Sequence, residues 1–185
     1  GSNGYGQLGD GTTTQRTMPV AVSGITTATA IAGGGSHSCA LLSDSTIKCW
    51  GYNGSGQLGD GTTTQRTTPV AVSGITTATA VAGGGNHTCA RLSDSTIKCW
   101  GYNTNGQLGD GTTTQRTTPV AVSGTGVATQ AVAGAYHTCT LLSSGTIKCW
   151  GSNSQGQLGD GLASFTPVTV SGISTATTLI AGGSG

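Results

Sequence analysis

Residues 87–111 read HTCARLSDSTIKCWGYNTNGQLGDG, and close copies of this stretch return at a fixed spacing of fifty residues. The copies occupy residues 1–50, 51–100, 101–150 and, in part, 151–185. The first two copies differ at only seven positions. A fixed period of this length indicates one supersecondary unit that buries its apolar surface against neighbouring copies. We therefore expect a single repeat array over residues 1–185.

Each unit contains four short stretches with the composition of β-strands. In the unit that begins at Pro69 they are residues 69–72, 79–82, 87–92 and 96–100. They are rich in Val, Ile, Thr and Ala, and clusters of Gly, Ser and Asp separate them. Four such strands per unit, without helical periodicity, are typical of a β-propeller blade and not of a helical solenoid. The sequence thus predicts an all-β fold of four-stranded antiparallel blades, an open array of three full blades plus fragments that ends on an inner strand near Ile180.

The six cysteines occur as two per complete copy, at Cys39 and Cys49, Cys89 and Cys99, and Cys139 and Cys149. In the third copy the turn between them is Ser143-Ser144-Gly145, and glycine in third place is typical of a three-residue hairpin loop. Such a loop sets the cysteines directly opposite each other, with Cβ atoms about 4.5–5.5 Å apart, which is close to disulfide reach. We therefore predict a disulfide across the outer hairpin of each blade and an oxidising, extracellular compartment. The alternative is three pairs of reduced core thiols in a cytosolic protein.

Composition excludes two classes of partner. Seven basic and six acidic residues leave a net charge of +1, so the chain lacks the basic surface that nucleic-acid binding requires. No apolar run approaches the ~20 residues that span a bilayer, so we expect no membrane insertion. The chain has neither an initiator Met nor a signal peptide, so we expect a mature chain or an excised piece.

Residues that could bind a metal or catalyse a reaction recur in every full copy. His37, His87 and His137 each precede a cysteine by two positions, but zinc sites usually pair two such clusters within one unit. We expect each histidine to hydrogen-bond the blade backbone. The bulky residues that recur beside them are Trp50, Trp100 and Trp150, which we expect to fill the blades. Catalysis normally needs one unique arrangement, and Glu is absent, so we predict a non-enzyme without a metal or cofactor.

Differences between the copies identify candidate binding loops, because side chains that face solvent or a ligand vary most freely. The candidates are Tyr52, Tyr102, Asn105 and Tyr136. Position 152 carries Ser where positions 52 and 102 carry Tyr, and the fourth copy lacks two residues between Gly161 and Pro167. Neutral drift on an exposed surface is the alternative explanation.

A longer motif places these units among known repeats. It consists of Trp100-Gly101-Tyr102-Asn103, Gly106 to Gly111, Pro119-Val120, Ala133-Gly134, His137 and Leu141-Leu142. The motif resembles the regulator of chromosome condensation repeat family, whose repeats form β-propellers, typically of seven blades. The resemblance covers essentially the whole chain, but three units and two fragments are too few to close such a ring. We expect a longer polypeptide, or several chains, to complete it.

The resemblance implies different functions for different members. The namesake eukaryotic proteins are intracellular exchange factors for a small GTPase that also contact chromatin, but this chain matches neither an exchange-factor insertion nor a basic tail. Its paired cysteines, near-zero charge and near-identical copies look more like secreted bacterial versions that serve as binding modules.

Three functions follow as hypotheses. The leading one is an extracellular or cell-surface propeller, without catalytic activity, that engages a protein partner through its blade loops. A structural alternative is self-assembly into a filament, coat or completed ring, because unclosed ends expose apolar surface and strand edges. A third is a lectin-like module with one sugar site per blade, built on Tyr52 and Tyr102. The expected partners are a protein, further copies of the chain, or glycans.

Overall fold

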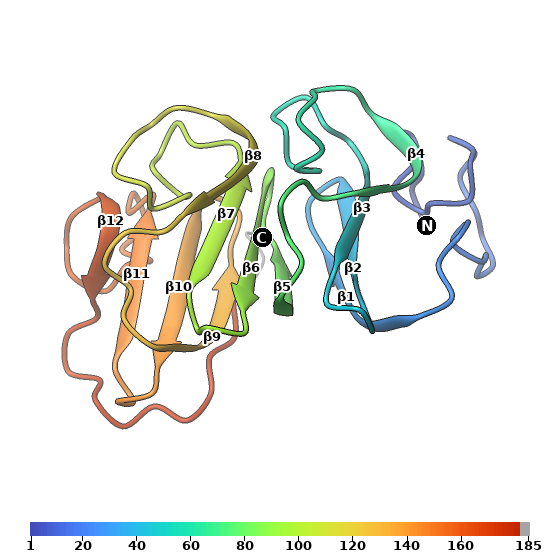
Figure 1. The fold of residues 1–185 in the computed structure, drawn as a ribbon. Helices are drawn as coiled ribbons and strands as arrows, with labels where there is room; N and C mark the ends of the chain where they lie inside the picture. Colours follow the sequence, from blue (N-terminus) through green and yellow to red (C-terminus); the bar gives the residue numbers. More distant parts are fainter. Residues whose placement is uncertain (182–185) are drawn as a thin grey trace.

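The computed structural model describes residues 1–181, which form three antiparallel β-sheets of four strands each (Figure 1). The first sheet contains β1 (Ala28–Gly33), β2 (His37–Leu42), β3 (Ile47–Gly51) and β4 (Arg66–Ala71). The second contains β5 (Ala78–Gly83), β6 (His87–Leu92), β7 (Ile97–Gly101) and β8 (Arg116–Ala121). The third contains β9 (Ala128–Ala133), β10 (His137–Leu142), β11 (Ile147–Gly151) and β12 (Ser164–Thr169). The predicted all-β fold of four-stranded blades is confirmed.

The first strand of each sheet lies on the inner side, where the sheets converge. β1 contacts β5 and β5 contacts β9, while the other strands of each sheet fan outward (Figure 1). These inner strands consist mainly of Ala, Thr, Val and Gly because little room is left between them. A Cβ atom at Gly83 would lie only 2.7 Å from the carbonyl oxygen of Gly33 in the neighbouring sheet. No helix long and apolar enough to cross a membrane occurs within residues 1–181.

The hairpin between the second and third strands has the predicted three-residue loop. In the third sheet the backbone N–H of Leu142 donates to Thr146, at 2.9 Å, and Gly145 has a φ of 80°. Ser45 and Ser95 adopt the same left-handed conformation in the other copies, with φ of 64° and 67°. This register sets each cysteine pair face to face, with Cα atoms 4.1 Å apart, and the three expected disulfides are present.

Two details of the predicted topology are wrong. The strand predicted at 69–72 starts at Arg66 and pairs with β3 of the preceding unit, so the disulfide joins the two central strands and not the outer hairpin. No strand forms near Ile180, because residues 173–181 have no second strand of their own sheet to pair with. The side chain of Gln130 bonds both the backbone N–H and the carbonyl of Leu179 instead, at 2.9 and 2.6 Å.

The apolar core lies between the sheets, and each layer combines a disulfide with a tryptophan. In the layer between the first two sheets, Cys39 and Cys49 of the first sheet pack with Trp100 of the second. The next layer contains Cys89 and Cys99 together with the third tryptophan, Trp150. One face of a full blade therefore presents its disulfide to the following sheet, and the opposite face presents its tryptophan to the preceding one.

Candidate functional site

Two sets of loops lie at the same end of the sheets. The first-to-second strand loops (34–36, 84–86 and 134–136) meet the third-to-fourth strand loops (52–65, 102–115 and 152–163) there (Figure 1). The backbone N–H of Tyr52 donates to Ser36 at 2.9 Å, and Tyr102 repeats this bond with Asn86. We call the surface formed by these two sets of loops the loop face.

One asparagine and one aspartate organise each long loop. In the first full blade, Oδ1 of Asn53 accepts from the N–H of Leu58, and its Nδ2 donates to the carbonyls of Thr62 and Thr64. Asp60 accepts from Thr62 and pairs with a guanidinium nitrogen of Arg66 at 2.9 Å. The aspartate of the Gly-Asp-Gly motif thus has a turn-forming role in the loop.

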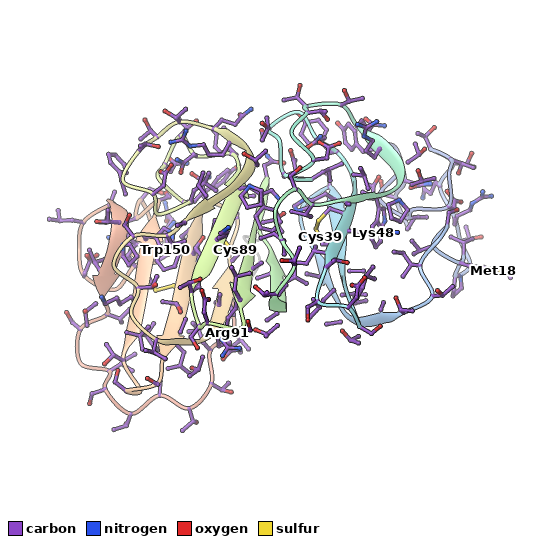
Figure 2. All side chains as sticks on the ribbon, in the orientation of Figure 1. Met18, Cys39, Lys48, Cys89, Arg91 and Trp150 are labelled. Atoms are coloured by element: carbon purple, nitrogen blue, oxygen red, sulfur yellow. A yellow bond between two sulfur atoms is a disulfide. The ribbon has the colours of Figure 1, made fainter. Side chains whose placement is uncertain are left out.

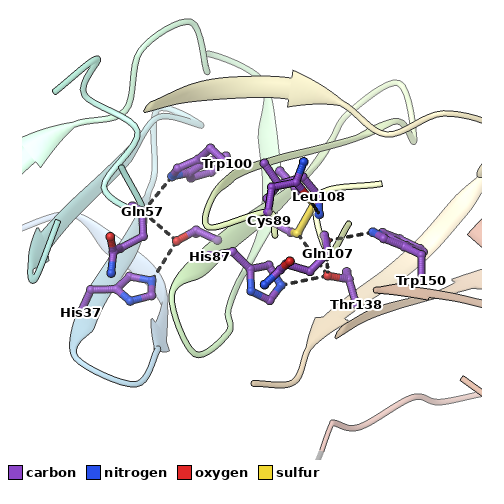
Figure 3. Close-up of a disulfide and its surroundings, with 12 residues drawn as sticks. His37, Gln57, His87, Cys89, Trp100, Gln107, Leu108, Thr138 and Trp150 are labelled. Atoms are coloured by element: carbon purple, nitrogen blue, oxygen red, sulfur yellow. Dashed lines mark hydrogen bonds between the residues drawn. A yellow bond between two sulfur atoms is a disulfide. The ribbon is translucent and has the colours of Figure 1, made fainter. Parts of the chain in front are cut away.

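The long loop also fastens each sheet to the next one. The carbonyl oxygen of Gln57, in the loop after β3, accepts from Nε1 of Trp100 and from the hydroxyl of Thr88, both at 2.9 Å (Figure 3). The carbonyl of Gln107 accepts in the same way from Trp150 and Thr138 (Figure 3). Because both donors are buried, these bonds also satisfy polar groups that would otherwise destabilise the layer.

The recurring histidines bond across the junction to a side chain, and not to the blade backbone as the sequence suggested. Nε2 of His37 lies 2.8 Å from the hydroxyl of Thr88, and His87 lies 2.9 Å from the hydroxyl of Thr138 (Figure 3). The single proton of each threonine hydroxyl is donated to a glutamine carbonyl, so the histidine Nε2 must carry the proton and donate. His137 holds the equivalent position in the third sheet and is half-buried.

Burial keeps the first two histidines neutral. It lowers the pKa of His37 from 6.5 to about 4. Burial, together with the charges of His37 and His137, lowers the pKa of His87 to about 3. The Nδ1 atoms of both rings are buried without a hydrogen-bond partner among residues 1–181. Protonation of Nδ1 would create a buried positive charge whose N–H has no hydrogen-bond acceptor, so protonation opposes folding.

Acid is expected to destabilise the protein first through these histidines. Below pH 6.5 the unfolded chain binds protons that the folded protein excludes until the pH approaches 4 for His37 and 3 for His87. The free energy of unfolding therefore has its full value above pH 6.5 and falls as the pH drops. At about pH 5 each of the two buried histidines has lowered it by roughly 2 kcal/mol. Urea unfolding at a series of pH values from about 7.5 to 5 measures this loss.

The matched control for this pH dependence is His87→Gln, which removes one titrating ring and keeps an N–H for Thr138. The stability of this variant should fall less steeply over the same range, because one of the buried histidines that exclude a proton is gone. The carboxylates affect stability only at lower pH. The Thr12 hydroxyl lowers the pKa of Asp10 from 3.8 to about 2, so the contribution of this carboxylate is lost only below about pH 3.8. A stability that stays constant down to about pH 5 would contradict the histidine assignment.

The structure brings three of the four candidate binding residues into aromatic pairs. Tyr102 and Tyr136 have ring centroids 6.5 Å apart, and Tyr52 pairs at 4.9 Å with Tyr5, which the sequence prediction missed. Tyr5 and Tyr136 are 45% and 48% exposed. Asn105 joins neither pair and lies at the next junction along the loop face. Tyr5 could have been found from the variation between copies, because the aligned positions carry Ser, Asn and Gln.

Tyr136 leaves a buried amide without a partner. In the first junction, Nε2 of Gln57 donates to Oδ1 of Asn86 at 3.2 Å. Tyr136 replaces that asparagine in the next sheet, and Nε2 of Gln107 is buried with no acceptor among the described residues. A buried donor in this state costs roughly 1–3 kcal/mol, so Tyr136 is unfavourable for stability alone.

Comparisons with known proteins agree with this architecture. Prp20p from Saccharomyces cerevisiae aligns with a TM-score of 0.80 and 19% identity, over 96% of this chain and 48% of Prp20p. Human WBSCR16 aligns with a TM-score of 0.77 and 24% identity, over 90% of this chain and 45% of WBSCR16. The chain therefore spans about half the length of these structures, and at such identities the likeness shows the fold alone. A comparison with curated proteins finds no match.

Sequence similarity identifies the family of the repeat. The regulator of chromosome condensation (RCC1) repeat matches residues 1–41, 49–91 and 99–141. A second description of the same repeat matches residues 28–57, 78–107 and 128–157. These matches cover most of the chain, and they follow its fifty-residue period. The chain belongs to the regulator of chromosome condensation repeat family.

Proposed function

We propose that the chain is a non-catalytic binding module that engages a protein partner through the loop face. The observation that carries this proposal is the placement of the tyrosines: three of the four lie on the loop face, and the fourth, Tyr5, in the N-terminal segment, pairs there with Tyr52. Tyrosine supplies a large amphipathic contact area at low conformational entropy and is enriched where proteins bind one another. Ser, Thr, Asn and Gly surround the pairs and supply adaptable hydrogen bonding.

The unfavourable placement of Tyr136 supports a binding role. An asparagine at this position satisfies the glutamine amide in the preceding sheet, so an alternative with a better hydrogen-bond network is already present in the chain. Tyr136 weakens the fold and remains half-exposed beside Tyr102. Contact with a partner would account for a residue of this kind.

One structural relative, yeast Prp20p, has protein partners in two separate structural studies. The structure of Prp20p was described with its binding to Gsp1p and histones, and the same protein, as yeast RCC1 (Prp20), was solved bound to Kap60. These structures support a protein as the class of ligand. The three disulfides support an oxidising setting, and we propose secretion to the cell surface or medium, as in bacterial binding modules.

Retention of proteins from the medium of the producing cells tests the proposal. The immobilised chain should retain a protein that Tyr136→Asn loses, while Lys98→Ala, on β7 within the second sheet, retains it. Tyr136→Asn should also be at least as stable as the original chain, because it restores an acceptor for Gln107. Equal retention by the original chain, Tyr136→Asn and Lys98→Ala would refute the loop-face assignment. Loss of retention only in a variant that is also destabilised would refute it as well.

Self-assembly is a second candidate because one apolar surface is uncovered. Ile31 on β1 is 80% exposed, whereas Val81 at the equivalent position packs against the core of the preceding sheet. Met18 is 75% exposed on the N-terminal segment (Figure 2) and lines, with Ile31 and Trp50, a hollow of about 580 Å³. Contiguous apolar surface of this kind favours association. Sedimentation equilibrium over a range of concentrations distinguishes a monomeric binder from a self-assembling subunit.

A further inference from the structure

A hollow of about 450 Å³ opens on the loop face between the second and third sheets. The loop between β7 and β8 contributes Asn105, and the connection between β11 and β12 contributes Ser152 and Asn153. Phe165, on β12, supplies an aromatic ring, and none of the lining side chains is charged. The volume lies in the range of about 300–1,000 Å³ that small-molecule sites occupy.

The hollow coincides with departures from the repeat pattern. Ser152 stands where the two preceding units carry Tyr52 and Tyr102, so an aromatic ring is missing from this rim. The segment after Gly161 is two residues shorter than its counterparts, and Ala163 of this short segment also lines the hollow. Both changes remove side-chain and backbone volume from the same place.

The shorter segment also frees the amide of Asn153. The equivalent Asn103 is buried, and its Nδ2 donates to the carbonyls of Thr112 and Thr114 at 3.1 and 3.0 Å. Among the described residues, Nδ2 of Asn153 keeps only a contact of 3.4 Å with Asp160, and the side chain is partly exposed. An amide group that closes the loop in the other units is therefore available to a ligand here.

Phe165 is held with its ring toward the hollow. The aligned residues in the other units are Thr67 and Thr117, so the aromatic ring is particular to this site. A Cβ atom at Gly106 would lie 2.4 Å from Cδ1 of Phe165, which means that the ring rests directly on this glycine. Phe165 nevertheless remains 47% exposed. It offers an apolar platform that is supported from behind.

We propose that this hollow binds a neutral saccharide unit. A pyranose ring has an apolar C–H face that packs on an aromatic ring, and hydroxyl groups that both donate and accept hydrogen bonds. Phe165 provides the platform, while the amides of Asn105 and Asn153 and the hydroxyl of Ser152 provide donors and acceptors. A charged ligand would find no opposite charge in the lining. This is one site at a break in the repeat, independent of the proposed protein partner, and not a sugar site in every blade.

The test uses the full chain and a panel of neutral saccharides: glucose, galactose, mannose, N-acetylglucosamine and their β-1,4-linked disaccharides. Saturation-transfer NMR should detect at least one of them, with a Kd from about 1 mM downward. Phe165→Thr is the matched variant, because threonine occupies the aligned positions in folded units, and it should weaken binding by about tenfold, or about 1.4 kcal/mol. Tyr136→Asn lies at a different part of the loop face and should leave saccharide binding unchanged.

Two results would overturn the saccharide site. One is the absence of saturation transfer to every saccharide in the panel while the chain is folded. The other is equal binding by Phe165→Thr, with a thermal midpoint unchanged from the original chain. Both leave the protein-binding proposal intact, because that proposal depends on Tyr136 and on retention of a protein.

Discussion

Replacing Trp100 by alanine is expected to lower the free energy of unfolding by about 3–5 kcal/mol. The indole is fully buried between the first two sheets, where it packs with the disulfide of the first sheet. Its Nε1 also donates to the carbonyl of Gln57 at 2.9 Å. The substitution therefore leaves a cavity and removes a bond between two sheets, so we expect one of the largest losses that a single substitution can cause in this chain.

Urea unfolding followed by circular dichroism measures this loss. Trp100→Phe keeps most of the buried area and removes the N–H donor, so it should be less destabilising than Trp100→Ala. Thr88→Val removes the other donor to the Gln57 carbonyl. The double variant Trp100→Phe with Thr88→Val should lose more stability than the two single variants together, because only in the double variant is this carbonyl left without a donor. A Trp100→Ala protein within about 1 kcal/mol of the original would contradict this account of the layer.

Breaking the disulfides is expected to have a comparable or larger effect. Each closes a loop of ten residues in sequence separation, for which chain entropy gives somewhat under ~3 kcal/mol. Three such contributions are of the same order as the whole stability of a typical domain, about 5–15 kcal/mol. The reduced chain should therefore be largely unfolded or melt at a much lower temperature. Thermal unfolding with and without reductant measures the difference.

The location of the disulfides adds a kinetic expectation. Both sulfur-bearing residues of the first two pairs are completely buried between sheets, so a reductant reaches them only after local opening. Native protein should show no thiol that reacts with an alkylating agent, and reduction should be slow without denaturant. Cys89→Ala together with Cys99→Ala, which leaves no lone thiol, should lower the urea midpoint. Six reactive thiols in native protein would contradict the pairing.

Much of the fold could be predicted because it depends on short-range rules. The fifty-residue period, the alternation of β-prone runs with glycine-rich turns and the three-residue loop before Thr146 all depend on neighbouring residues. The cysteine pairing follows from the same loop, since its length sets the register. Strand grouping could not be predicted in this way. Residues 66–71 are equally β-prone whether they open a sheet or close one, and only the pairing with β3 decides between these possibilities.

The candidate site was less predictable because it combines residues from different units. The tyrosines at 52, 102 and 136 were identified by variation between copies, but their pairing depends on how neighbouring sheets pack. The partners of His37 and His87 are threonines fifty-one residues away, and the local sequence contains no sign of them. Nor could the sequence show that the two-residue deletion after Gly161 exposes the amide of Asn153.

The sequence by itself determined the repeating four-stranded unit, its disulfides and its membership of the repeat family, because these depend on period, turn chemistry and residue identity. Only the tertiary structure decided which surfaces meet. The Trp100 indole and the Gln57 carbonyl come together because a loop crosses to the next sheet. Phe165 faces a hollow because a shortened segment no longer covers it. Contacts between sheets follow from the packing of distant segments, which identical local sequences leave open.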